Sequence, residues 1–169
     1  GRLCSTLVAV GDLPGAIQNC TRNAELLRGL LTIDPGAPTA GAWTLQLALN
    51  GIATGNAQRL SGDPKTAERT LRDTVATLQA LLDKSPGKTN ADLERRLAVA
   101  FAYRANALAD LGDLRGASDS YGGAVERLSR LAALDPANTR FRTDLVYMLT
   151  KRGELLVKGG DVAGARQAT

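Results

Sequence analysis

The strongest constraint in this sequence is a short motif that returns at a nearly constant interval along the chain. Each copy begins with Gly-Asp, and an alanine follows five residues after the glycine. The interval between successive glycines is 51, 50 and 48 residues for Gly11, Gly62, Gly112 and Gly160. A fixed period of this size indicates one supersecondary unit that stacks on copies of itself.

A second marker closes each copy, and the two markers together divide the chain into helices. Asp34-Pro35, Ser85-Pro86 and Asp135-Pro136 recur at intervals of 51 and 50 residues, and a proline cannot continue a helix. We therefore expect an all-α fold with one helix before and one after each Gly-Asp turn. The expected helices cover residues 1–10, 14–33, 40–60, 64–84, 91–111, 114–134, 139–159 and 162–169.

These markers also set the expected domain organisation. The chain is predicted to be a single repeat array, and it begins and ends inside a repeat, so we expect a fragment of a larger protein. The repeats span residues 1–35, 36–86, 87–136 and 137–169.

Residues at the expected helix ends suit their positions. Asp63-Pro64 combines a capping side chain with the residue best tolerated at the first helical position. Asn138 or Thr139 is expected to cap the helix over 139–159. The step Asp34-Pro35-Gly36 ends the helix over 14–33, because a proline cannot continue a helix and Gly36 tolerates a positive φ.

Small and large residues align in columns when the repeats are superimposed. Small residues at facing positions let two antiparallel helices approach closely, and larger ones fill the flanks. Seven residues before each turn glycine the column holds Cys4, Gly55, Ala105 and Gly153. The large columns, interpreted as ordinary core, hold Trp43, Leu93 and Phe141, then Leu47, Leu97 and Leu145.

This pattern resembles the tetratricopeptide repeat, a helix–turn–helix unit of 34 residues. Gly55, Ala105 and Gly153 match that family's first small position, and the alanine after each turn matches the second. Leu71 and Tyr121 match its large position in the second helix. The period here is longer, because the first helix begins two turns earlier, as in long-period arrays of bacterial proteins.

The resemblance implies a right-handed α-solenoid of stacked antiparallel helix pairs, with about 3.5 repeats. For function, it implies a module that binds or scaffolds a protein or peptide. Such arrays are often attached to signalling or regulatory domains such as Ser/Thr kinases, which we expect here as well.

In such solenoids the first helix of each pair lines a concave groove. Steps of three and four residues back from each turn glycine select one face of these helices. That face carries amides suited to a peptide backbone, tyrosines that offer rigid contact, and basic groups that could meet acidic ones. The candidate partner-binding residues are Asn56, Arg96, Tyr103, Asn106, Arg140, Tyr147, Lys151 and Glu154.

Other interpretations of these residues stay open. Arg96, Asp144 and their neighbours would simply neutralise one another on a solvated face. Alternatively, the array is a structural spacer, or associates with itself through exposed terminal repeats. A carboxylate clamp of the kind found in some tetratricopeptide proteins is not expected, because residues such as Ile52 and Thr150 replace its basic side chains.

Nucleic-acid binding is a weaker alternative. The net charge is only +4, from 21 basic and 17 acidic residues interspersed along the chain, whereas nucleic-acid binding needs concentrated basic charge. The basic residues that would serve it are Arg95, Arg96, Arg140, Arg142, Lys151 and Arg152.

Catalysis, cofactors and metals are not expected. The chain contains no His, which removes the commonest general base and metal ligand. Gly122-Gly123 falls within the expected helix 114–134, where it should bend the helix or admit a close neighbour rather than cradle a phosphate. No segment is apolar for long enough to span a membrane, and we expect a cytoplasmic protein.

Cys4 and Cys20 are the two cysteines of the chain, and they fall in facing columns of the first hairpin. Both replace small or apolar residues, so we expect buried free thiols. Their proximity would allow a disulfide in an oxidising compartment, but the expected cytoplasmic location argues against one. Without His, the pair does not indicate a zinc site.

Overall fold

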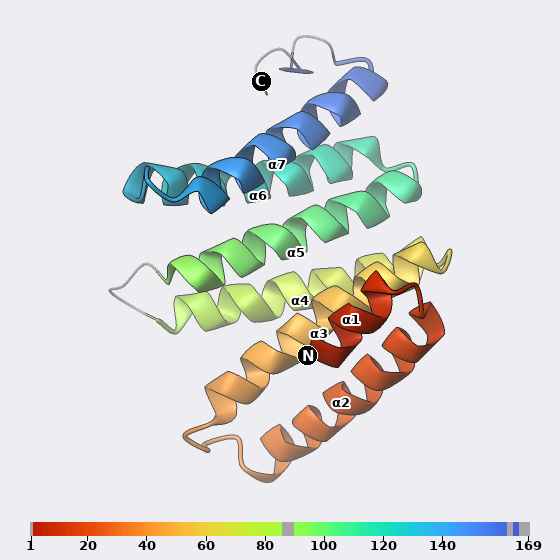
Figure 1. Ribbon diagram of the computed structural model, residues 1–169, viewed down its shortest axis with the longest axis vertical. Helices are drawn as coiled ribbons and strands as arrows, with labels where there is room; N and C mark the ends of the chain where they lie inside the picture. Colours follow the sequence, from red (N-terminus) through yellow and green to blue (C-terminus); the bar gives the residue numbers. More distant parts are fainter. Residues whose placement is uncertain (1, 86–89, 162–163, 166–169) are drawn as a thin grey trace. The chain divides into compact units, whose positions relative to one another are not determined.

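The computed structural model describes residues 2–85, 90–161 and 164–165, which hold seven helices and no strand. The all-α prediction is confirmed, and each of these helices begins and ends within one residue of its predicted bounds. The eighth predicted helix, over 162–169, lies mostly outside the described residues. The helices are α1 (Arg2–Ala9), α2 (Leu13–Ile33), α3 (Ala40–Leu60), α4 (Pro64–Asp83), α5 (Ala91–Asp110), α6 (Leu114–Leu134) and α7 (Thr139–Lys158) (Figure 1).

The chain divides into two compact units, Gly1–Pro86 and Gly87–Thr169, which we describe separately. In the first unit, α1 packs on α2 and α3, α2 packs on α3, and α3 packs on α4. In the second unit, α6 packs between α5 and α7, and α5 also reaches α7. Successive helices within each unit run antiparallel (Figure 1).

Four turns of one geometry follow α1, α3, α5 and α7. Their glycines, Gly11, Gly62, Gly112 and Gly160, have φ between 82° and 91°. At the third turn the Asp113 N–H donates to the Leu108 carbonyl at 3.0 Å and so completes the end of α5. Asp113 Oδ1 then accepts from the Gly116 N–H at 2.8 Å, which caps the start of α6. The same short segment therefore ends one helix and begins the next.

The capping aspartates of the other turns make the same bond. Asp12, Asp63 and Asp161 each accept from the backbone N–H three residues later, at 2.8 to 3.0 Å. Hydrogen bonds from the side chain and the backbone of Thr66 hold the pKa of Asp63 below its ordinary value of 3.8. The carboxylate therefore stays ionised at neutral pH, where its charge also favours the helix N-terminus.

The helix ends near the prolines differ in part from expectation. α2 ends at Ile33 as predicted, with Asp34 as its C-cap directly before Pro35. Gly36 does not use the positive φ that it tolerates, and Asp34 already leaves the helix, with φ −140° and ψ 82°. Asn138 occupies the N-cap position of α7 but makes no capping bond. Its side-chain amide instead donates to Asp135 Oδ2 at 3.3 Å.

The small-residue columns lie in the core, as predicted. Ala16, Ala67 and Ala117 are fully buried, and so is Ala105. A Cβ on Gly55 would lie 2.5 to 2.9 Å from the side-chain atoms of Leu71, so α3 and α4 approach too closely there for a larger residue.

The large columns are buried to different degrees. Leu93, Leu97 and Phe141 are buried, whereas Trp43, Leu47 and Leu145 are only half-buried. The core of the second unit is built mainly on α6, where Leu128, Leu131 and Tyr121 are at most 2% exposed.

The glycine pair of α6 admits close neighbours, and the helix continues through it. A Cβ on Gly123 would lie 3.4 Å from the ring of Phe101 on α5. The Arg127 guanidinium lies over the same ring, 4.9 Å from its centroid. Gly123 thus leaves room for the ring of Phe101 on α5, and the Arg127 guanidinium of α6 covers that ring.

The cysteines correct one expectation. Cys4 and Cys20 are buried as predicted, but they form a disulfide between α1 and α2, with their Cα atoms 5.6 Å apart. The repeat explains their proximity, because Gly55 and Leu71 occupy the equivalent positions and are in contact in the next hairpin. The prediction of free thiols is therefore wrong.

The disulfide predicts a measurable stabilisation of the first unit. Replacement of both cysteines, as Cys4→Ala with Cys20→Ala, should lower the free energy of unfolding by roughly 3 kcal/mol, because the bond restricts the unfolded chain. Urea unfolding followed by circular dichroism measures this, and the reduced wild-type protein is the control. Two reactive thiols in the denatured, unreduced protein would contradict the disulfide directly.

Candidate partner-binding surfaces

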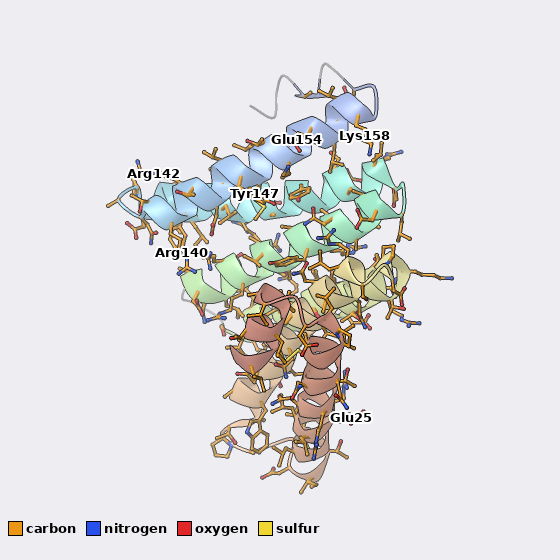
Figure 2. All side chains as sticks on the ribbon, turned by 45° about the vertical axis from the view of Figure 1, so that its right-hand side comes forward. Glu25, Arg140, Arg142, Tyr147, Glu154 and Lys158 are labelled. Atoms are coloured by element: carbon orange, nitrogen blue, oxygen red, sulfur yellow. A yellow bond between two sulfur atoms is a disulfide. The ribbon has the colours of Figure 1, made fainter. Side chains whose placement is uncertain are left out.

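The predicted partner-binding residues lie mainly in the unit Gly87–Thr169. Asn56 is the exception, on α3 of the other unit. Arg96, Tyr103 and Asn106 on α5 are half-buried, as is Lys151 on α7. The remaining three are the exposed residues Arg140, Tyr147 and Glu154 of α7, and they follow one another along that helix (Figure 2).

Three of these residues meet at one cavity of about 260 Å³. Asn106 on α5 lies on one side, and Lys151 and Glu154 on α7 lie on the other. Tyr121 of α6 also lines the cavity, together with Lys158 near the end of α7 (Figure 2). The steps of three and four residues used on the sequence therefore place an amide and two opposite charges around one hollow.

One of the hydrogen-bonding groups of the Asn106 side chain is already used within the unit. The Tyr121 hydroxyl donates to Asn106 Oδ1 at 2.8 Å, and Tyr121 is only 1% exposed. A buried tyrosine usually needs such a partner. The bond uses the amide oxygen, so the amide N–H groups of Asn106 remain available as donors. Asn56 has Leu71 at the position equivalent to Tyr121, so no hydroxyl stands there.

Lys151 and Glu154 form an ion pair one turn apart on α7. Lys151 Nζ lies 2.7 Å from Glu154 Oε2, and their side chains are 37% and 57% exposed. This hydrogen bond raises the pKa of Lys151, so the amine stays protonated. Pairs this exposed contribute little to stability. A ligand carboxylate could therefore replace Glu154 at small cost.

The start of α5 fits the solvated-face interpretation better. Arg96 Nε lies 2.6 Å from Asp92 Oδ2 on the same helix. Arg95 Nε lies 2.7 Å from Asp144 Oδ2 on α7, with both side chains less than a quarter exposed. These arginines are neutralised within the chain and tie α5 to itself and to α7.

The same pairs reduce the basic face required for nucleic-acid binding. Arg95, Arg96 and Lys151 each lie against a carboxylate. Arg152 is half-buried, with its guanidinium beside Gly122 of α6. Arg140 and Arg142 are exposed near the beginning of α7, away from Lys158 at its end (Figure 2). Of the six basic residues named for nucleic-acid binding, only Arg140 and Arg142 are therefore exposed.

Several predicted residues do not join the cavity. Tyr103, Tyr147, Arg96 and Arg140 are absent from its lining. Tyr147 is 49% exposed and offers contact area beside the cavity, on the same helix as Lys151.

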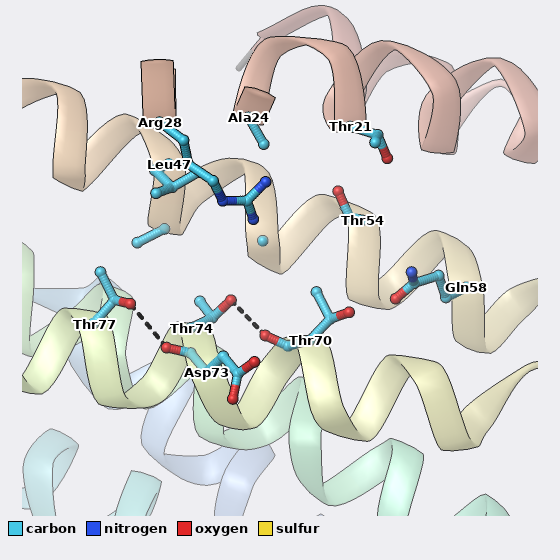
Figure 3. Close-up of a pocket in the computed structure, with 12 residues that line it drawn as sticks. Thr21, Ala24, Arg28, Leu47, Thr54, Gln58, Thr70, Asp73, Thr74 and Thr77 are labelled. Carbon is cyan, nitrogen blue, oxygen red and sulfur yellow. Dashed lines mark hydrogen bonds between the residues drawn. The ribbon is translucent and has the colours of Figure 1, made fainter. Parts of the chain in front are cut away.

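A larger cavity in the unit Gly1–Pro86 was not predicted from the sequence. It measures about 430 Å³ and lies between α2, α3 and α4 (Figure 3). We call it the threonine groove, because Thr21, Thr54, Thr70, Thr74 and Thr77 line it with Arg28, Gln58, Asp73 and four small or apolar residues. One signal was available: residues 70, 74 and 77 are spaced four and three apart, which places three hydroxyls on one face of a helix.

Comparison with protein-family models gives no match for this chain, and comparison with curated proteins gives none either. In the described part of the chain, no helix combines the length and apolar character needed to cross a membrane. Among the same residues, no three His, Cys, Asp or Glu side chains gather as metal ligands would. The two cavities described above and the surfaces around them are therefore the features that bear on function.

The bond between Tyr121 and Asn106 predicts an energetic coupling between α5 and α6. Tyr121→Phe should lower the free energy of unfolding by about 1 kcal/mol, because one buried hydrogen bond is lost. Asn106→Ala should cost at least as much, since it removes the same hydrogen bond and several side-chain contacts, and the double variant should cost less than the sum. Urea unfolding measures all three, with Tyr103→Phe as the control. Strictly additive effects would show that the bond does not form in solution.

Proposed function

We propose that this chain is a tetratricopeptide-like repeat module that holds a protein or peptide partner. The observation that carries the proposal is the cavity at which Asn106 of α5 meets Lys151 and Glu154 of α7. α5 and α7 are the first helices of consecutive hairpins, the elements that line the groove in proteins of this kind. The proposal includes a right-handed solenoid of about 3.5 repeats, within a larger bacterial signalling or regulatory protein such as a Ser/Thr kinase.

The chemistry of this surface suits an extended peptide with an acidic side chain. The N–H groups of Asn106 can donate to a ligand carbonyl. Lys151 and the exposed Lys158 offer charge-assisted bonds to a carboxylate that displaces Glu154. Tyr147 adds rigid apolar contact with a polar tip. No step of this function requires a cofactor or a catalytic group.

Self-association is the second candidate, and one surface favours it. Leu26, Leu30 and Ile33 of α2 are 64%, 42% and 83% exposed, and their spacing of four and three residues places them on one helical face. Exposed apolar stripes of this kind are typical of contact surfaces.

The cytoplasmic location stays a prediction. The disulfide between Cys4 and Cys20 weighs against it, because cytosolic reductants keep most thiols reduced.

Peptides selected from a phage-displayed random library test the proposal. We expect enrichment of peptides with acidic residues, and Lys151→Ala should weaken the best of them by about tenfold or more through loss of a charge-assisted bond. Tyr147→Ala should also weaken binding. Isothermal titration calorimetry measures the affinities, and Lys65→Ala, an exposed lysine of α4, is the control.

Two outcomes would overturn the proposal. One is a failure of the library to enrich any peptide. The other is an affinity that none of the α5 and α7 variants changes. A molecular mass that rises with concentration in light scattering, and falls in an Ile33→Ser variant, would favour self-association instead.

A further inference from the structure

The threonine groove has the form of a trough along α3. Residues of α3 line it between α2 and α4, from Leu47 toward one end to Gln58 toward the other (Figure 3). The walls are α2, which contributes Arg28, and α4, which contributes Asp73 (Figure 3). The volume of about 430 Å³ falls within the range of natural ligand pockets.

Three of the five threonine hydroxyls of the groove present oxygen atoms rather than protons. Thr54, Thr74 and Thr77 each donate to the carbonyl oxygen four residues earlier, at 2.8 to 2.9 Å. A hydroxyl has one proton and two lone pairs, so each oxygen can still accept. The dashed lines of Figure 3 mark two of these bonds, along α4.

Gln58 adds an acceptor that lacks a partner. Its side-chain Oε1 is buried and has no hydrogen-bond partner among the described residues. Buried polar atoms are normally satisfied, and those that are not call for an explanation. An N–H donor brought by a ligand would bond the threonine oxygens, and a turn of the Gln58 side chain, whose Oε1 is covered, would bring this acceptor to the same donor.

The groove also requires a ligand that accepts hydrogen bonds. The Arg28 guanidinium extends from α2 over Leu47, and it can only donate (Figure 3). Asp73 on the opposite wall can only accept while it is ionised. A simple cation would face Arg28, and a simple anion would face Asp73. The lining therefore matches a group that carries both N–H donors and carbonyl acceptors.

From this complementarity we infer that the threonine groove binds the main chain of an extended peptide with small or polar side chains. A peptide backbone alternates N–H and C=O groups along a line, as the trough requires. Among its twelve lining residues there is no aromatic platform of the kind a sugar ring stacks on.

This site goes beyond the surface of α5 and α7 and does not depend on it. The two sites lie in different units. A peptide bound in the threonine groove contacts α2 and α4, the second helices of their hairpins, as well as α3.

Titration of the isotope-labelled full chain with the blocked peptide acetyl-Ser-Gly-Ser-Gly-amide, followed by nuclear magnetic resonance, tests the inference. Saturable shifts are expected at the backbone amides of Thr54, Thr70 and Thr77, and at the side-chain amide of Gln58. Arg28→Ala and Thr77→Val should each weaken binding about fivefold, since each removes one hydrogen-bonding group. Arg28 is exposed, so its variant should fold normally.

Thr143→Val is the matched control, because that hydroxyl also donates to the carbonyl four residues earlier but lies on α7, outside the groove. The Thr143→Val variant should bind the peptide with the affinity of the wild type. The absence of saturable shifts would overturn the inference. So would tighter binding of putrescine or glucose than of the peptide, which would assign the groove to an amine or a sugar. Binding lost in Lys151→Ala but kept in Thr77→Val would place the peptide on α5 and α7 instead.

Discussion

The conformation of the turn glycines is the constraint on which the rest of this structure depends. At φ between 82° and 91°, Gly11, Gly62, Gly112 and Gly160 occupy a region that costs other residues about 1–2 kcal/mol. Each glycine ends a helix, and the aspartate after it caps the next helix. Two helices joined by so short a link must fold back on each other, so the turn fixes the hairpin and its register.

The register then decides which side chains meet. Because the turn fixes the hairpin, the residue seven before each turn glycine meets the residue nine after it, so Gly55 meets Leu71 and Cys4 meets Cys20. The same register places Asn106 against Tyr121. The helix faces that do not pack within the hairpins line the two cavities. One cavity lies beside α5 and α7, and the other lies along α3. The proposed binding functions follow from these remaining polar faces.

The sequence predicts most of this fold because the residues that begin and end its helices act locally. Asp63, Pro64 and the glycine of each turn fix helix ends without help from distant residues. Asn138 is the exception, because its side chain bonds Asp135 and does not cap α7. The alignment of the repeats predicts that Cys4 faces Cys20, but it does not determine whether the two thiols are oxidised. Within the candidate site, spacing alone brings Asn106, Lys151 and Glu154 together. The threonine groove was missed because it depends on how α2 and α4 separate across α3, which no single helix specifies.

A pair of alanine substitutions in one hairpin tests the role of the turn glycines most directly. Gly112→Ala should lower the free energy of unfolding by about 1–2 kcal/mol, because alanine pays the steric cost of the positive φ. Gly122→Ala, within α6, should raise it by up to about 1 kcal/mol, since its Cβ would meet Arg152 at an ordinary contact distance of 3.6 Å. Urea unfolding of both variants should therefore give opposite signs. A Gly112→Ala protein as stable as the wild type, or more stable, would contradict the account.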